Sequence, residues 1–500
     1  MAGAGCGFGE SGISPPSDRI FFPAGIAVDP GGQWLYVVNS NSDLRFNAGT
    51  VVAVNLSKAA QDRAQSRENP AQFSPALQTC PNSRFVQPQN ADPTFCCRDF
   101  VDPNVLVCDD RRYVDPAATV RIGSFGGGVV VQPFDKAAPQ SDPRRRLFVV
   151  VRAEPSITFI DATVSPGKVS LRCTGEGAGA DPFCTDDFRI RSVRQPDGTI
   201  VKQPDGAELT LQEEPHPLLL DDELDLLYVG HLGGVDRGRI VSRGVSVIDV
   251  CGPEQKPRLT SVLTDALPRT GAIGVTSLLR TWSGPEGTPG REPLLLATSE
   301  LTSDIAELVF TDPAQAQAPC RSAQRTPKLA AGRRFTSSAF ATHNADLRGL
   351  VLDEDSQKAW VLHRQYAVRG MFNPPSVVAI DRHPDEHGLP VNQPIGVLEV
   401  CNGPNRMVRH DAGRGPRLFI NCFENGQIYV VEPDLLTVEA IIEVGTGPVD
   451  FVFAENEPSV AYVAGFANNN VSVVDLKPGS VTEYRVVQRL GFPRPTAVPQ

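Results

Sequence analysis

The sequence contains no hydrophobic run long enough to cross a membrane. Its longest apolar runs, such as Leu147 to Val151 and Leu218 to Leu220, have the length of a β-strand. A membrane-spanning helix needs roughly 20 apolar residues. We therefore predict no transmembrane segment, and membrane association only through a lipid attached near the N-terminus.

Metal, redox and catalytic signatures are also missing. No two cysteines have CxxC spacing, and no cysteines and histidines cluster as zinc ligands do, so we predict no metal site and no cofactor. The sequence has no Gly-x-Ser-x-Gly motif, which marks the nucleophile of many hydrolases. Gly126-Gly127-Gly128 lacks the lysine of a phosphate loop and is interpreted as a tight strand entry. No catalytic residue is predicted.

Positive charge is scarce. The 47 Lys and Arg residues stand against 58 Asp and Glu residues, which gives a net charge of −11. Nucleic-acid binding needs a basic face that neutralises phosphates, so no nucleic-acid partner is predicted. The run Arg144-Arg145-Arg146 is interpreted as a solvated loop.

Turn-forming residues, in contrast, are abundant. The 44 Gly and 44 Pro residues, together with the absence of long helical patterns, favour many short strands joined by tight turns. A chain of 500 residues exceeds the usual size of one domain. A repeat array escapes that limit because each unit adds its own layer of core.

A three-part unit recurs along the chain: an apolar strand, a strand similar to Leu-Tyr-Val-Val-Asn, and an alternating strand ending in Asp. The first copy comprises residues 23–32, 35–39 and 50–55, and the last comprises 447–453, 461–465 and 470–475. The second part recurs between them at 147–150, 227–231, 294–298, 359–363 and 418–422. The third part recurs at 156–161, 245–249, 305–311, 376–381 and 427–432. Each part therefore occurs seven times, and a fourth strand usually follows.

This pattern predicts an all-β fold. Short strands with β-branched and aromatic residues at alternating positions are typical of half-buried strands. Four such strands in succession form an antiparallel sheet, and sheets stacked radially bury both faces and leave few exposed edges. We predict a seven-bladed β-propeller of four-stranded antiparallel blades over residues 20–498.

The repeats resemble those of the YVTN family of β-propeller proteins, most closely in the first, sixth and seventh copies. The resemblance covers roughly residues 20–495 once insertions are excluded. It implies a propeller fold. Because family members are mostly described as binding or structural proteins of the cell surface or periplasm, it also implies a binding or structural role in one of these places. The motif specifies the fold far better than it specifies a function.

Two long insertions interrupt the repeat, near residues 58–117 (the first insert) and 164–213 (the second insert). The third strands of the last two copies end 43 residues apart, at Glu432 and Asp475. The corresponding intervals between the first three copies are longer, and the additional residues lie in the two inserts. Both inserts contain cysteines and are rich in Pro, Gln, Asp and Gly. Segments of this kind are functional loops or surface decoration.

Cysteines placed in such loops indicate disulfides and an oxidising compartment. On the blade model the expected pairs are Cys401 with Cys422, Cys251 with Cys320, and Cys173 with Cys184. Cys80, Cys96, Cys97 and Cys108 then pair within the first insert in one of three connectivities.

The eleventh cysteine lies in an N-terminal tether, residues 1–19. The run Ala4-Gly5-Cys6 resembles the end of a bacterial lipoprotein signal, although Gly3 replaces the usual leucine. Cys6 is therefore expected to be either acylated or a free terminal cysteine. An extracytoplasmic location follows, as an outer-membrane or surface lipoprotein or as a periplasmic or secreted protein.

The ligand site of a propeller is usually the mouth of its central channel. Aligned repeats place His216, Arg348, Arg406 and Asp450 near the starts of first strands. They place Asn39, Arg152, His231, Thr298 and His363 near the ends of second strands, on the same rim. Such a mixed set suits an anionic or sugar ligand, although polar residues are common at propeller mouths without any function.

The favoured hypothesis is a non-enzymatic binding or scaffold protein that presents its loops to a protein or a cell-envelope polysaccharide. One alternative is a propeller enzyme, a lactonase-like hydrolase or a metal-assisted lyase, with its site at the channel mouth. Another is a subunit of a larger extracellular assembly. Oligomeric state is left open.

Overall fold

The computed structural model is almost entirely β-sheet. The residues it describes are 12–73, 77–80, 95–139, 141–175, 182–204, 206–232, 234–236, 239–241, 244–267, 273–283, 291–300, 302–320, 322, 325–337, 346–364, 374–454 and 456–492. They contain two α-helices, α1 (Leu56–Glu68) and α2 (Pro313–Gln317). Neither helix is long and apolar enough to cross a membrane.

Seven sheets follow one another along the chain, each with four antiparallel strands in sequence order. Sheet 1 contains β1 (Pro23–Val28), β2 (Trp34–Asn39), β3 (Gly49–Asn55) and β7 (Val114–Ile122). Sheet 2 contains β8 (Gly126–Pro133), β9 (Arg144–Val151), β10 (Ser156–Ser165) and β11 (Lys168–Arg172). Sheet 3 contains β13 (Pro215–Asp221), β14 (Leu226–His231), β17 (Val245–Asp249) and β18 (Arg258–Leu263).

The remaining four sheets have the same order. Sheet 4 contains β19 (Ile273–Trp282), β20 (Pro293–Glu300), β21 (Asp304–Phe310) and β22 (Leu329–Thr336). Sheet 5 contains β23 (Asp346–Asp353), β24 (Lys358–Arg364), β25 (Ser376–Asp381) and β26 (Gln393–Glu399). Sheet 6 contains β27 (Pro404–His410), β28 (Arg417–Cys422), β29 (Gln427–Glu432) and β30 (Thr437–Glu443). Sheet 7 contains β31 (Pro448–Ala454), β32 (Glu457–Gly465), β33 (Asn470–Asp475) and β34 (Arg485–Leu490).

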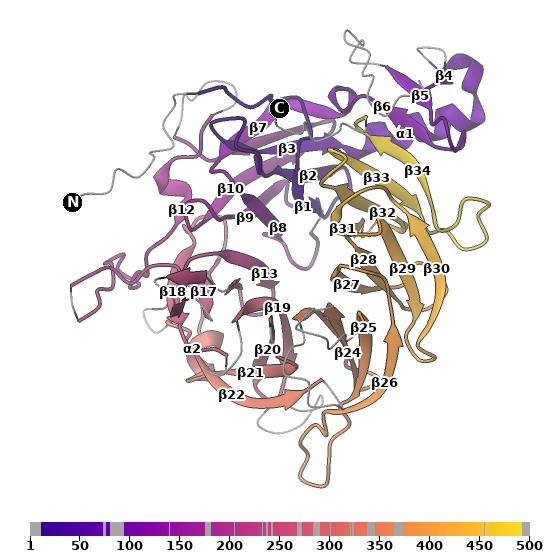
Figure 1. The fold of residues 1–500 in the computed structure, drawn as a ribbon. Helices are drawn as coiled ribbons and strands as arrows, with labels where there is room; N and C mark the ends of the chain where they lie inside the picture. Colours follow the sequence, from indigo (N-terminus) through magenta and orange to yellow (C-terminus); the bar gives the residue numbers. More distant parts are fainter. Residues whose placement is uncertain are drawn as a thin grey trace.

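The sheets stand around a common centre (Figure 1). The first strand of each sheet contacts the first strand of the next, and β1 also contacts β31, so the ring closes on itself. The first strands are innermost, and outer strands such as β22, β26 and β30 form the rim. This arrangement is consistent with a β-propeller.

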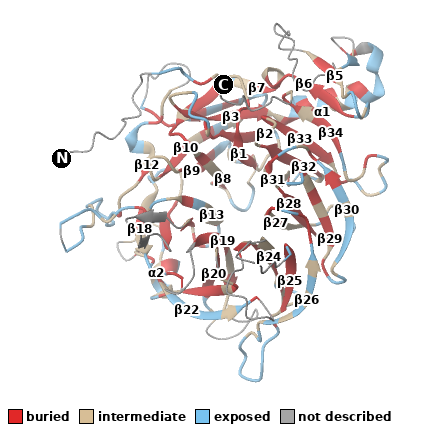
Figure 2. Cartoon of the chain, in the orientation of Figure 1, coloured by how far each residue is buried: buried red, intermediate tan, exposed pale blue. Residues whose placement is uncertain are grey.

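Apolar side chains between neighbouring sheets form the core, and β2 shows how. Leu35 and Val37 pack into the cluster shared with sheet 7, whereas Tyr36 and Val38 pack into the cluster shared with sheet 2. Every residue of β2 is therefore buried. Figure 2 shows burial concentrated in the inner strands. The expectation of half-buried strands is corrected here, because inner strands are covered on both faces and only the outer strands are half-exposed.

The arginine run at 144–146 is part of a strand and not a solvated loop, and two of its three side chains lie in this core although Arg144 is exposed. It begins β9, and the side chains of Arg145 and Arg146 are only 2% and 3% exposed. Arg145 pairs with Asp29 of sheet 1 at 3.0 Å, and Arg146 pairs with Asp161 at 2.7 Å. Both charges are accommodated between sheets because each has a carboxylate partner.

The first insert becomes part of the ring. After β3 the chain forms α1 and then three short strands, β4 (Gln78–Thr79), β5 (Cys96–Arg98) and β6 (Leu106–Cys108). β6 pairs in parallel with β34, so the insert of sheet 1 extends sheet 7 to seven strands. The insert therefore joins the first sheet to the last.

The second insert makes a compact projection. β12 (Arg189–Ile190) pairs with β10, and the chain then contains Gln-Pro-Asp-Gly twice, at 195–198 and 203–206. Each copy closes a turn through a hydrogen bond from its glycine N–H to its glutamine carbonyl, both 2.9 Å.

Three backbone hydrogen bonds then form a closed cycle in the second insert. Val193 donates to Leu209, Leu209 to Val201 and Val201 to Val193, at 2.8–2.9 Å. Val193 is buried against sheets 2 and 3, while most residues of the two turns are exposed.

Five disulfides are present: Cys80–Cys97, Cys96–Cys108, Cys173–Cys184, Cys251–Cys320 and Cys401–Cys422. The last three join the partners given by the blade model, and the first two settle the connectivity within the first insert. Five disulfides indicate an oxidising, extracytoplasmic environment. Cys6 lies outside the described residues.

Candidate functional site

The first strand of every sheet carries a β-bulge near its start, at the end of the ring where the predicted mouth lies. In each sheet the pairing with the second strand skips at least one residue there. The skipped residues are Ala24, Gly127 and Gly128, His216 and Pro217, Gly274 and Thr276, Arg348, Asn405, and Val449. Bulges redirect side chains and are common next to binding sites.

A left-handed residue directly precedes five of these strands. Gly403 (φ 64°) and Gly447 (φ 66°) hold this conformation in sheets 6 and 7. Phe22 (φ 44°), Phe125 (φ 57°) and Glu214 (φ 50°) hold it in sheets 1 to 3. Side chains other than glycine are strained in this region, and such strain is often found at functional sites. Glu214 is the charged member of this set.

The first strands of sheets 1 and 2 approach each other through glycine backbone. A Cβ on Gly25 would lie 2.4 Å from the carbonyl oxygen of Gly127 and 2.9 Å from Cα of Gly128. The glycine run at 126–128 thus begins β8, where it permits close approach of the two sheets. The first strands of other sheets carry charged residues at this end.

Arg406 of sheet 6 forms an ion pair with Asp450 of sheet 7. Asp450 also accepts hydrogen bonds from the backbone N–H groups of Ile26, at 3.0 Å, and Phe451, at 2.8 Å. Its carboxylate is therefore fixed, and it is buried. The Arg406 side chain is 42% exposed, so part of the guanidinium remains open to a ligand.

Two further arginines are each held by carboxylates. Arg348 of sheet 5 lies 2.5 Å from Glu300 and 2.7 Å from Asp346. Arg152, which follows β9, donates from Nε to Glu214 at 2.6 Å. Burial raises the pKa of Asp346, while the charge of Arg348 opposes that shift.

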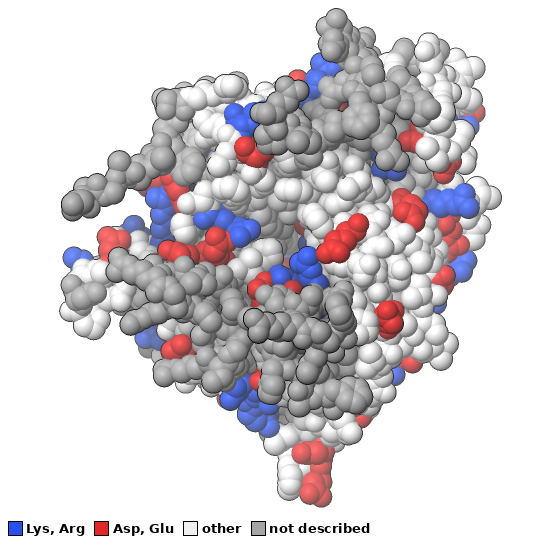
Figure 3. Space-filling model, viewed as in Figure 1, with Lys and Arg blue, Asp and Glu red and all other residues white. Residues whose placement is uncertain are grey.

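His216 of sheet 3 is affected by the charges of all three arginines. Surrounding protein, together with the positive charges of Arg152, Arg348 and Arg406, lowers the pKa of His216 to about 3. His216 is nevertheless exposed. His216 is therefore neutral at pH 7, and four sheets place a histidine or arginine within electrostatic reach of one another. Figure 3 shows basic and acidic side chains adjoining at the hollow of this face.

The second-strand residues have different surroundings. Asn39 is fully buried, accepts a hydrogen bond from the Phe21 N–H at 3.0 Å and donates to Thr50 at 2.8 Å. His231 is also fully buried, with Nε2 2.9 Å from the Ser246 hydroxyl, and burial lowers its pKa to about 4. Both side chains hold strands together and are closed to a ligand.

Thr298 and His363 complete that set. Thr298 is fully buried, and its hydroxyl lies 2.9 Å from that of Thr276. His363 Nε2 lies 3.1 Å from the Ser337 hydroxyl, and burial lowers its pKa to about 4. The expectation that Asn39, His231 and Thr298 line the mouth is thus corrected, because strand-end side chains turn into the inter-sheet contacts.

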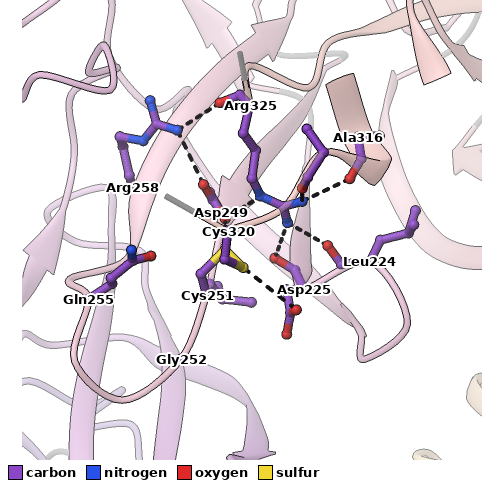
Figure 4. Close-up of a disulfide and its surroundings, with 12 residues drawn as sticks. Leu224, Asp225, Asp249, Cys251, Gly252, Gln255, Arg258, Ala316, Cys320 and Arg325 are labelled. Atoms are coloured by element: carbon purple, nitrogen blue, oxygen red, sulfur yellow. Dashed lines mark hydrogen bonds and ion pairs between the residues drawn. A yellow bond between two sulfur atoms is a disulfide. The ribbon is translucent and has the colours of Figure 1, made fainter. Parts of the chain in front are cut away.

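A metal site is not apparent in the described ranges. The only group there of three or more candidate ligands is Asp249, Cys251 and Cys320. Cys251 and Cys320 form a disulfide (Figure 4), so their sulfurs are not thiolate ligands.

The candidate site at the mouth therefore comprises Arg152, Glu214, His216, Glu300, Asp346, Arg348, Arg406 and Asp450. Sequence reasoning missed Glu214, Glu300 and Asp346. Glu214 had a detectable signal, because it directly precedes Pro215, just as Gly403 and Gly447 precede Pro404 and Pro448 in the last copies. Glu300 and Asp346 stand at strand ends that the aligned landmarks did not reach.

Comparisons with known proteins do not assign the chain to a family. No family model matches the chain, and no curated protein matches it. A solved structure described as a candidate 6-phosphogluconolactonase from Bacteroides uniformis has 11% identity and a TM-score of 0.46, covering 88% of this chain and 89% of that one.

Two other solved structures give similar values. A candidate 6-phosphogluconolactonase from Bacteroides fragilis has 12% identity, a TM-score of 0.43 and coverage of 85% of each chain. Hydrazine synthase of Kuenenia stuttgartiensis has 13% identity and a TM-score of 0.47, covering 94% of this chain and 98% of that one. Similarity at this level says nothing about activity, and the YVTN family is not shown by it.

Proposed function

We propose that the chain is a seven-bladed, extracytoplasmic β-propeller of YVTN type that acts as a non-enzymatic binding protein. Its central mouth takes an acidic sugar or an acidic cell-envelope polysaccharide. The observation that carries this proposal is a set of three arginine–carboxylate pairs, Arg152–Glu214, Arg348–Glu300 and Arg406–Asp450, whose arginine charges all act on His216. The three arginines and His216 come from four different sheets, so the closed ring brings them to one end of the molecule.

The chemistry of the mouth suits a ligand with both hydroxyl and acid groups. Each arginine already has a carboxylate partner, which balances the charge. Sugar hydroxyls donate to carboxylates and accept from guanidinium groups, while an acid group on the sugar accepts paired hydrogen bonds from an arginine. Neutral His216 adds one donor and one acceptor.

The location is part of the proposal. The five disulfides support an oxidising compartment, and acylation of Cys6 would tether the ring to a membrane through residues 1–19. Intact-mass measurement of protein recovered from cells tests this arrangement, because a diacylglycerol-modified cysteine adds a mass that Cys6→Ser removes.

Calorimetric titration with glucuronate-containing oligosaccharides tests the binding site. We expect Arg406→Gln and Arg348→Gln each to weaken binding by roughly tenfold or more. Arg485→Gln, an exposed arginine on β34, serves as the matched control and keeps wild-type affinity. Equal affinity in all four proteins would refute a site at the mouth.

The same variants separate binding from catalysis. Turnover of sugar lactones by the wild type, abolished in His216→Ala, would replace the binding proposal by the lactonase-like alternative. Binding without turnover supports the proposal as stated.

A further inference from the structure

Among the described residues four arginines are almost fully buried, Arg145, Arg146, Arg325 and Arg382, and the last two differ in their partners. Arg325, 3% exposed, pairs with Asp249 at 3.0 Å. It also donates to the backbone oxygens of Ala316, Ala318, Leu224 and Asp225 at 2.5–3.2 Å. Figure 4 shows this guanidinium surrounded by acceptors beside the Cys251–Cys320 disulfide. Arg325 is a satisfied structural residue.

Arg382, 4% exposed, is not satisfied in this way. Its Nε donates to the side chain of Asn392 at 3.1 Å. Its Nη1 is buried without a hydrogen-bond partner in the described part of the chain. Leaving a buried charged donor unmet is costly, since it loses water without gaining an acceptor. Burial accordingly lowers the pKa of Arg382, although the charges of Glu307 and Glu354 oppose the shift.

Arg382 lines a cavity of about 120 Å³ between sheets 4 and 5. The cavity lies where β19, β23 and β25 end, opposite the strand starts that form the mouth. Trp282, Arg291, Glu354, Pro384 and Pro390 also line it. The volume exceeds that needed for a single water, so the space accommodates a small molecule or a group on a larger one.

Three other charged residues line the cavity, namely Arg291, Glu354 and Asp355, and the first two are paired with each other. Arg291 donates to Glu354 at 3.3 Å and lies over the Trp282 ring, 4.4 Å from its centroid. Thr281 donates to the same carboxylate at 3.3 Å. Arg382 therefore has an N–H donor, on Nη1, with no acceptor in the described part of the chain. An anionic ligand would supply that acceptor.

We propose that this cavity is a second ligand site, which binds a small carboxylate- or phosphate-bearing molecule through Arg382. The oxyanion accepts from the guanidinium, while Trp282 and the facing pair Pro384 and Pro390 cover its organic part. The site is independent of the mouth, being formed by different strands at the other end of the ring.

Tryptophan fluorescence provides a local probe for this site. The chain has three tryptophans, and Trp34 and Trp360 are buried at 2% and 1% exposure, so Trp282 alone borders the cavity. We expect inorganic phosphate or glucuronate, titrated at constant ionic strength, to produce a saturable change. Glucose, which has no charge, should produce none. A response to phosphate alone, or to glucuronate alone, identifies which oxyanion the site prefers.

Substitutions test the role assigned to Arg382. Arg382→Gln should shift the midpoint at least roughly tenfold, whereas Arg172→Gln, an arginine 61% exposed on sheet 2, leaves it unchanged. Arg382→Lys keeps the charge and should retain part of the affinity, which separates lost binding from lost folding. Trp282→Phe should remove the signal while the heat of phosphate binding persists in calorimetry. An unchanged spectrum in the wild type, or a wild-type response in Arg382→Gln, would mean that the cavity holds only water and would overturn the proposal.

Discussion

The two inserts have similar compositions but very different structures. Each is rich in Pro, Gln, Asp and Gly and contains cysteines. The first contains the run Val105-Leu106-Val107, which is 0–3% exposed and lies beside the edge of β34. The second contains two Gln-Pro-Asp-Gly turns, each closed by hydrogen bonds within the turn or to the residue that follows it. An inserted segment thus joins the core when it supplies an apolar strand to an open edge, and otherwise folds on itself.

The largest expected difference concerns apolar packing. Leu106→Ala in β6 should reduce the free energy of unfolding by about 3 kcal/mol, because a fully buried leucine is lost from the core. Leu209→Ala in the second insert, where the side chain is only partly buried, should cost about 1 kcal/mol. Denaturant unfolding of both variants measures this difference. Equal losses in the free energy of unfolding would show that both inserts contribute equally to the hydrophobic core.

The disulfides sharpen the comparison, since Cys96–Cys108 and Cys173–Cys184 close loops with separations of 12 and 11 residues. Chain entropy therefore predicts a similar loss of about 3 kcal/mol when either is replaced by alanines. Hydrogen exchange should differ. Losing Cys96–Cys108 frees β6 and exposes the amides of β34, whereas losing Cys173–Cys184 leaves the ladder of β10 and β11 protected. Unaltered exchange in β34 would contradict the role of the first insert in joining the ends.

Acid should weaken the first insert at its junction with the N-terminal segment. Burial acts to raise the pKa of Asp109, but hydrogen bonds from Arg111 and the charges of Arg19 and Arg111 together hold it below the usual value. A lowered carboxyl pKa stabilises the fold above the pKa of the unfolded chain. That contribution is lost as the pH falls below the unfolded pKa of about 4 and through the lower pKa of the folded state. Asp109→Asn should remove this part of the acid dependence of unfolding, and an unchanged pH profile would argue against it.

The smallest effect is expected at the tip of the second insert. Replacing residues 195–208 by two glycines removes mostly exposed turns, so the free energy of unfolding should change by less than about 1 kcal/mol. Thermal unfolding checks this, with the binding assays repeated on the same protein. If the shortened protein loses binding in these assays but keeps its free energy of unfolding, the tip takes part in ligand or partner recognition.

The sequence predicted the strands correctly where the alternating side-chain pattern is contained within a single short segment. Leu35 to Asn39 and its counterparts are strands in the structure because their β-branched and aromatic residues serve two neighbouring sheets. Cys401 and Cys422 could be paired because strand direction alone places them at one end of a sheet. The interpretation of the run at 144–146 as a solvated loop was wrong. Its partners are not visible in the run itself, because Asp29 is distant in the sequence and Asp161 lies on the next strand.

The site was predictable only in part, for related reasons. His216, Arg348, Arg406 and Asp450 stand at repeat positions that alignment can reach. The closed surroundings of Asn39, His231 and Thr298 depend on which way each strand end turns, which the repeat pattern does not encode. Arg382 and its cavity arise between two sheets, so no single repeat contains them.

The four antiparallel strands of each sheet come from one part of the chain, and only the extension of sheet 7 by β6, β5 and β4 comes from elsewhere. This has a consequence for how the molecule assembles. The four-stranded sheets can form one after another as the polypeptide emerges during synthesis, because none of these four strands comes from the far end of the chain. Closure comes last, when β31 meets β1 and β34 meets β6. A circular permutant with new termini in the connection at 444–447, between β30 and β31, should therefore retain all seven sheets. Only the order in which the ring is joined would change.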